Sequence, residues 1–132
     1  MACDIAYPLA ATDADRFSIS ELSDEFGISA RALRFYEEEG LIAPAREGVT
    51  RVYSRRDRAR VAWILRGKSV GFSLDEIGEM LDLYDLGDGR ATQRRVMAQR
   101  CRQRAEALRA QLADLQTMIG RLSDFAESVE GD

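Results

Sequence analysis

The segment SISELSDEFGISARALRFYEEEG, residues Ser18–Gly40, carries two helix patterns with a single glycine between them. In the first pattern, Ile19, Leu22 and Phe26 recur at the spacing that places side chains on one face of a helix. Its start, SISE, fits the Ser-x-x-Glu capping box, in which a serine oxygen accepts a free backbone N–H. The segment therefore predicts a helix that begins just after Ser18.

The second helix follows after a tight turn. Gly27 suits the left-handed backbone conformation that such a turn needs. Ser29 can cap a helix that runs to about Glu39, and Gly40 ends it. Two short helices joined by a glycine turn have the layout of a helix-turn-helix unit.

The chain then changes character. LIAPAREGVTRVYS contains a proline, a glycine and a run of β-forming residues, which predicts a short hairpin, or wing. SRRD and SLDE resemble capping boxes, although Asp is a weaker partner than Glu in the first. They predict a third helix over about Arg55–Lys68 and a fourth over Leu74–Leu86. The sequence GDG at residues 87–89 is expected to break the chain.

The last segment has a narrow apolar stripe at intervals of three and four residues, formed by Cys101, Ala105, Leu108, Leu112, Leu115, Ile119, Leu122, Ala126 and Val129. This pattern, sustained over four heptads, is typical of a coiled coil. A helix over Thr92–Val129 would be roughly 57 Å long, whereas a domain of some seventy residues is about 25 Å across. The stripe therefore needs a partner, most simply a second copy, parallel or antiparallel.

Composition narrows the class of protein. The 132 residues carry a net charge of −4, but residues 16–71 carry +3, so a phosphate-binding surface is possible there. Two cysteines are too few for a disulfide scaffold. No apolar run is long enough to span a membrane, and the start lacks the features of a signal peptide. We expect a cytoplasmic protein with no membrane partner and a disordered arm at residues 1–14.

Four blocks in order resemble the MerR family of bacterial transcription regulators: ISELSDEFGISARALRFYEEEGLI, REGVTRVYS, DRARVAWILRGKSVGFSLDEIGEMLDL and the coiled-coil helix, together spanning Phe17–Val129. The resemblance implies a mostly α fold with a winged helix-turn-helix head (residues 15–87) and an antiparallel coiled-coil dimer (residues 90–129). It implies a homodimer that distorts an overlong promoter spacer so that RNA polymerase can engage both elements. LRGKSVGFSLDEIGEMLDLYD looks most like the subgroup that controls branched-chain amino acid and fatty acid degradation genes.

Candidate DNA contacts begin in the second helix. If this helix enters the major groove, its N-terminal residues meet base edges. We expect Arg31 to contact a base or phosphate and Arg34 a phosphate, against the alternative of solvated arginines. The resemblance assigns Tyr36 to a phosphate, and Phe35 is expected to pack. The three glutamates at residues 37–39 should point away from DNA and pair with the basic run at residues 55–60.

Other candidates flank this helix. The resemblance implies that Arg51 in the wing pairs with a phosphate, while Tyr53 either supports the hairpin or donates its hydroxyl. Lys68, with Arg66 as its alternative, is expected at a second wing. Ser18 and the free N–H groups of its helix could receive a phosphate. The sequence indicates no specific contact for any of the four arginines of the basic run, residues 55–60.

Other functions have weaker signals. A thiol- or metal-responsive regulator could use Cys101, but the sequence has no histidine, and a small apolar seam residue is the simpler interpretation. Cys3 has no assigned role. No phosphate loop or nucleophile–base pair indicates an enzyme, and no cofactor or resident metal is expected. A coiled-coil adaptor that keeps only the helix-turn-helix shape remains an alternative, and any small-molecule effector is unidentified.

Overall fold

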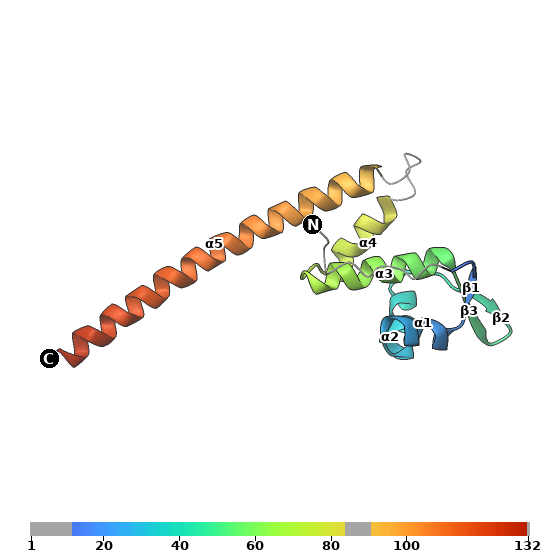
Figure 1. Cartoon of the computed structure of the whole chain (residues 1–132), viewed down its shortest axis with the longest axis horizontal. Coiled ribbons are helices and arrows are strands. Elements are labelled where there is room, and N and C mark those ends of the chain that lie inside the picture. The colour runs from blue at the N-terminus through green and yellow to red at the C-terminus, as the bar shows by residue number, and fades with distance from the viewer. Residues whose placement is uncertain (1–11, 84–90, 132) are drawn as a thin grey trace. The chain divides into compact units, whose positions relative to one another are not determined.

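The computed structural model describes residues 12–83 and 91–131. The chain divides into two compact units, a head that ends at Gly87 and a tail that begins at Asp88. Described helices and strands follow in the order β1 (Arg16–Phe17), α1 (Ile19–Phe26), α2 (Ala30–Glu38), β2 (Ala45–Glu47), β3 (Thr50–Ser54), α3 (Arg55–Ser69), α4 (Leu74–Asp82) and α5 (Ala91–Glu130) (Figure 1). The protein is thus mostly helical with a small sheet, as predicted.

The helix-turn-helix prediction is confirmed in its local chemistry. The Ser18 hydroxyl accepts from the backbone N–H of Glu21 at 3.0 Å, and the Glu21 carboxylate accepts from the Ser18 N–H at 2.9 Å. Gly27 has φ of +65°, in the left-handed region where a Cβ is costly. Ser29 caps α2 by accepting from the Ala32 N–H at 3.0 Å. These local bonds fix where each helix begins and where the turn lies.

The wing is an antiparallel hairpin of β2 and β3, with Gly48 at φ of +63° in its turn. A third strand, β1, was not predicted. It pairs antiparallel with the other edge of β3, so that Phe17 lies opposite Tyr53 and the sheet order is β1-β3-β2. Two residues are too few to show an alternating pattern, and only the pairing with β3 makes them a strand.

Helix α3 packs against both β3 and α4. Val61 and Ile64 of α3 are fully buried, and Ile77 and Met80 of α4 are each only 2% exposed. Gly67 lies where α3 meets α4, and a Cβ built on it would be 2.8 Å from Cγ1 of Ile77. The close approach of the two helices therefore depends on a residue without a side chain.

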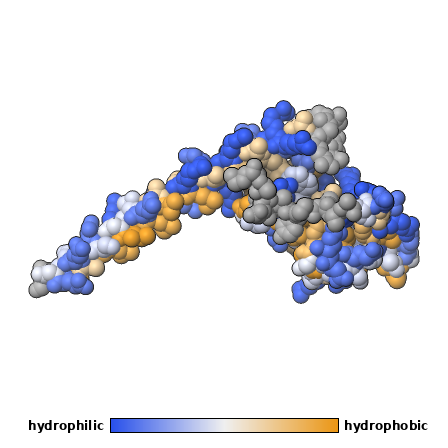
Figure 2. Space-filling view, in the orientation of Figure 1, coloured by the Kyte–Doolittle hydropathy of each residue, from blue (hydrophilic) through white to orange (hydrophobic). Residues whose placement is uncertain are grey.

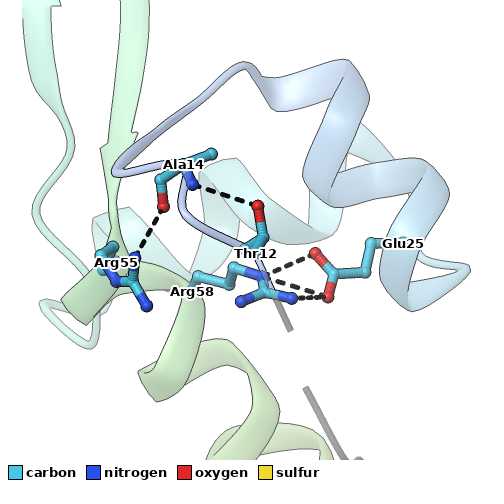
Figure 3. Close-up of polar contacts among 5 residues, drawn as sticks. All are labelled: Thr12, Ala14, Glu25, Arg55 and Arg58. Carbon is cyan, nitrogen blue, oxygen red and sulfur yellow. Dashed lines mark hydrogen bonds and ion pairs between the residues drawn. The ribbon is translucent and has the colours of Figure 1, made fainter. Parts of the chain in front are cut away.

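An ion pair between a buried arginine and a partly exposed glutamate joins α3 to α1. Arg58 Nε donates to the Glu25 carboxylate at 2.8 Å, and a terminal nitrogen of Arg58 donates to the same group at 2.5 Å (Figure 3). The Arg58 side chain is only 7% exposed, and its guanidinium carbon lies 5.2 Å from the centre of the Phe17 ring. The bonds to Glu25 raise the pKa of Arg58. This pair fastens the first helix of the helix-turn-helix unit to the core, since a buried charge without its partner would be costly.

Two predicted segments, the N-terminal arm and the fourth helix, lie only partly within the described residues. Ala14, within the predicted arm, donates its N–H to the Thr12 hydroxyl at 3.1 Å, and its carbonyl accepts from Arg55 at 3.2 Å (Figure 3). The rest of that arm, with Cys3, lies outside the described residues. Helix α4 ends at Asp82. The predicted last turn of this helix, residues 84–86, and the break at residues 87–89 also lie outside them.

The tail is one helix of 40 residues, close to the predicted span. At 1.5 Å per residue its length is roughly 60 Å. Its apolar stripe is exposed in the single chain: Leu112 is 56%, Ile119 63% and Leu122 64% exposed. Figure 2 shows these apolar residues gathered along one side of the helix. No helix in the described part of the chain is long and apolar enough to cross a membrane.

Replacing Gly67 by Ala should destabilise the head. The added methyl group meets Ile77 at 2.8 Å, and overpacking of this kind costs about 1–3 kcal/mol. Gly120→Ala is the matched control, because Gly120 has open space around it in α5, where alanine should stabilise the helix by up to about 1 kcal/mol. Urea denaturation at fixed protein concentration measures both changes. If the two variants changed the free energy of unfolding equally and in the same direction, the proposed clash between residue 67 and Ile77 would be contradicted.

Candidate nucleic-acid interface

Helix α2 has an apolar side and a basic side. Leu33 and Tyr36 are buried in the head, whereas Arg31 and Arg34 are exposed. Residues three apart are neighbours on a helix surface, so the two arginines form one patch near the N-terminal end of α2. Among the described residues, neither guanidinium has a hydrogen-bond or ion-pair partner within the chain. The patch is therefore available to an external anion.

Phe35 differs from its predicted role. Its ring was expected to pack, yet it is 42% exposed and lies 6.2 Å from the Tyr36 ring, at a tilted angle of 52°. Phe35 follows Arg31 by four residues, which places both on the same side of α2. An apolar ring is thus added to the basic patch.

Two predicted contacts from different helices come together. Lys68 of α3 donates to the Tyr36 hydroxyl at 3.3 Å, and its Nζ lies 5.7 Å from the centre of the Tyr36 ring. The hydroxyl that accepts this bond still has its own proton to donate. Lys68 is exposed whereas Tyr36 is only 2% exposed, so the ammonium is the accessible part of this pair and the tyrosine holds it in place. The alternative cation, Arg66, instead lies 4.9 Å from the ring centre of Trp63.

The wing is tied to the C-terminal end of α2 by Glu37. Arg46 and Arg51 lie directly opposite each other on β2 and β3. Glu37 Oε1 accepts from Nε of Arg51 at 2.7 Å, and Oε2 accepts from Arg46 at 3.3 Å. The bond from Arg51, with a smaller contribution from Arg46, lowers the pKa of Glu37, and it raises the pKa of Arg51. The expectation that the glutamates pair with the basic run is thus wrong for Glu37, because the folded wing brings other arginines closer.

Tyr53 lies in the core of the head. The residue has no exposed surface, and its hydroxyl has no hydrogen-bond partner in the part of the chain that the structure describes. Burial raises the pKa of Tyr53, since the charged form would lose hydration. Of the two roles considered for Tyr53, this position favours support of the hairpin over donation to a phosphate.

The start of α1 is already occupied by a carboxylate. The capping box engages both the hydroxyl and the N–H of Ser18 with Glu21. A phosphate at this helix end would have to approach beside the negative charge of Glu21, although the helix dipole attracts it. Ser18 is therefore the predicted contact with the least support from the geometry.

Comparison with known proteins assigns this arrangement of elements to a family. The model for MerR HTH family regulatory proteins matches residues 17–83, and the model described as "MerR, DNA binding" matches residues 58–125. The HTH-type transcriptional regulator CueR of Salmonella typhi is 32% identical over 117 residues, which cover 87% of this chain and 83% of that protein. The chain belongs to the MerR family. Members of this family are DNA-binding transcriptional regulators.

Other known proteins are also similar to this chain. Heavy metal-dependent transcription regulator 2 of Rhizobium meliloti (strain 1021) is 32% identical over 87% of this chain and 78% of its own length. The transcription regulator PbrR691 from Ralstonia metallidurans CH34, solved in complex with lead(II), is 31% identical in sequence. Its structure matches with a TM-score of 0.51, over 76% of this chain and 83% of the PbrR691 chain. HiNmlR, solved bound to promoter DNA, shares the fold with a TM-score of 0.56 at 24% identity, over 79% of this chain and 78% of its own.

The basic run of this MerR-family chain has internal roles that the sequence did not reveal. Arg55 bonds the carbonyl of Ala14, and Arg58 forms the ion pair with α1 described above. Arg60 donates to the carbonyl of Leu41 and lies 3.6 Å from the Asp82 carboxylate. The partners of these arginines lie 19 to 41 residues away, beyond the reach of any local pattern.

The Glu37 link should weaken in acid. Because the folded state lowers the pKa of Glu37, the link contributes stability above the ordinary glutamate pKa, and this contribution is lost as pH falls through the lowered value. Carboxyl-carbon NMR titration measures that pKa directly. Arg51→Ala should move it back toward the ordinary value by more than Arg46→Ala does, because the bond from Arg51 is the larger cause. The reverse order would contradict this account of the site.

Proposed function

We propose that this MerR-family protein binds promoter DNA as a homodimer and regulates transcription by distorting the promoter spacer, so that RNA polymerase can engage both promoter elements. The observation that carries the proposal is the exposed basic patch of Arg31 and Arg34 on α2, which has no partner within the described residues. Residues near the N-terminal end of a recognition helix meet base edges in the major groove. The family assignment supplies the class of partner.

The proposed contacts divide by role. Arg31 meets a base edge or phosphate, and Arg34 a phosphate, both from α2. Tyr36 and Lys68 share a second phosphate, supported by their 3.3 Å hydrogen bond. Arg51 binds a phosphate from the wing. Such phosphate contacts set the register of the protein on the duplex, whereas base contacts carry sequence information.

Two residues complete the proposed interface. The α1 end at Ser18 lies toward a flanking phosphate. Tyr53 supports the wing from the core, in agreement with its complete burial. Residues 15–87 form the proposed DNA-binding domain and residues 90–129 the dimerisation helix. The exposed apolar stripe of α5 supports the dimer, since eight large apolar side chains in α5 are at least half exposed in the single chain. The family resemblance favours an antiparallel pair.

The regulated genes are a finer proposal. The block around α4 resembles the subgroup that controls branched-chain amino acid and fatty acid degradation genes. By contrast, one of the relatives above is named as a heavy metal-dependent transcription regulator. Genes for leucine or acyl-CoA breakdown beside this gene would support the subgroup. Efflux genes would contradict it. We place the protein in the cytoplasm, without catalytic activity, and leave its effector unnamed.

A metal or thiol response through Cys101 is the second candidate, favoured by the names of relatives such as heavy metal-dependent transcription regulator 2. Cys101 is exposed in the single chain and lies on the apolar stripe of α5. The described residues contain no group of three or more His, Cys, Asp or Glu side chains arranged to hold a metal ion. Cys101→Ser separates the two functions, because a metal or thiol sensor would lose its response and a seam residue would not matter.

Arg34→Ala and Tyr36→Phe should each weaken DNA binding without unfolding the head. Arg34→Ala removes a cationic phosphate contact, so the steepness of log affinity against log salt should fall by about 0.9, whereas Tyr36→Phe removes a neutral donor and should leave the slope unchanged. A charge-assisted contact contributes about 1.5–3 kcal/mol. The probe is a duplex that the wild-type protein selects from a random-sequence library, and fluorescence anisotropy at several salt concentrations gives the slope. Arg121→Ala, an exposed arginine of α5, is the matched control and should bind normally. A coiled-coil adaptor would select no duplex at all.

The dimer is tested separately. Leu112→Lys places a charge in the apolar stripe and should yield a monomer at micromolar concentration, because the seam of a coiled coil excludes unpaired charge. Ala113→Lys adds the same charge one position outside the stripe and should remain dimeric. Sedimentation velocity distinguishes the two. A monomeric wild-type protein would refute the dimer.

A further inference from the structure

Three charged side chains, two arginines and one glutamate, meet at the junction between α2 and the wing. Arg46 and Arg51 are a direct cross-strand pair, and like charges in this position destabilise a hairpin. The Glu37 carboxylate bridges them with one oxygen for each guanidinium. The three groups together carry a net charge of +1, so the junction still attracts phosphate after the repulsion between the arginines has been offset.

The geometry at Arg51 leaves part of its fork available. Glu37 accepts from Nε, and within the described residues the two terminal nitrogens of Arg51 donate to no other group. The two terminal nitrogens can donate in parallel to one phosphate while Nε stays engaged with the carboxylate. The Arg51 side chain is 24% exposed and that of Glu37 is 23% exposed, so both lie against the protein rather than free in solvent.

We propose that Glu37 is a positioning residue for DNA binding: it holds the Arg51 guanidinium through Nε, so that the terminal nitrogens face a backbone phosphate and the wing meets DNA as one unit with α2. The inference rests on the proposed function, because it concerns how that interface binds DNA. The proposed mechanism is a smaller loss of side-chain conformational entropy when the protein binds DNA. An arginine already held in its bound geometry loses less side-chain entropy when it binds.

A competing account makes the opposite prediction. If Glu37 only occupied the arginines and had to be displaced by phosphate, its removal would increase DNA affinity. The 2.7 Å bond to Nε argues against displacement, since phosphate can bind the terminal nitrogens without breaking it. The cross-strand repulsion argues the same way, since removing Glu37 leaves two adjacent guanidinium groups without their anion.

The test compares Glu37→Ala with Glu38→Ala on the library-selected duplex. Both variants remove one negative charge next to the interface, but only Glu37 bonds the two wing arginines. We expect Glu37→Ala to bind about tenfold more weakly, as for the loss of one contact to a charged group, with a salt slope lower by about 0.9. Glu38→Ala should bind at least as tightly as wild type. Equal or tighter binding by Glu37→Ala would overturn the proposal.

A double-mutant cycle excludes a general effect on folding. In the Arg51→Ala background, adding Glu37→Ala should cause no further loss of affinity, because the residue acts through Arg51. An undiminished loss in that background would refute the positioning role. Glu37→Gln keeps an oxygen that accepts from Nε and should recover part of the affinity, while thermal melts report whether each variant is folded. If wild-type protein selects no duplex, the proposed function itself fails, which is a different result.

Discussion

The buried carboxylate of Asp57 is the interaction on which the arrangement of the head depends. This carboxylate accepts from the backbone N–H of Ser54 and from that of Ala43, each at 3.0 Å. The backbone N–H of Asp57 in turn donates to the Ser54 hydroxyl. One side chain thus caps α3 and ties the chain that leaves α2 to the end of β3. The hairpin lies between these two points, so its base is closed by hydrogen bonds to a single group that is only 5% exposed. Asp was expected to be a weak capping partner, but its shorter side chain here serves two segments.

Local signals predicted most of the fold. Each of these signals depends on residues that are close together in the sequence: the capping serines, the left-handed glycine and the repeat of the tail stripe. The sequence alone therefore located α1, α2, α3 and α5 closely. Long-range pairing was harder to predict. β1 exists only because Phe17 pairs with Tyr53, and no property of a two-residue segment indicates that pairing.

The candidate site shows the same difference between local signals, which the sequence reveals, and long-range contacts, which it does not. Arg31 and Arg34 lie in the first two turns of α2, as predicted, and both are exposed, while their contact with DNA stays a prediction. By contrast, nothing local distinguishes Arg58, which is buried and paired with Glu25, from Arg34, which is exposed. Both stand in basic, mixed-charge stretches, and only the tertiary fold separates them. An excess of arginine therefore serves two purposes in this head: some guanidinium groups stabilise it, and others remain for an anion.

The proposed control of transcription through DNA shape places a mechanical requirement on such a head. Bending a site of 20–30 base pairs costs on the order of 1–6 kcal/mol, and the protein must supply this energy through its contacts. Contacts on a wing that could swing freely would follow the DNA instead of bending it. Asp57 of α3 holds the base of the hairpin, and Glu37 of α2 holds its strands through Arg51. Two attachments prevent rotation that a single one would permit, so the proposed phosphate contacts of the wing and of α2 can act on the duplex as one surface.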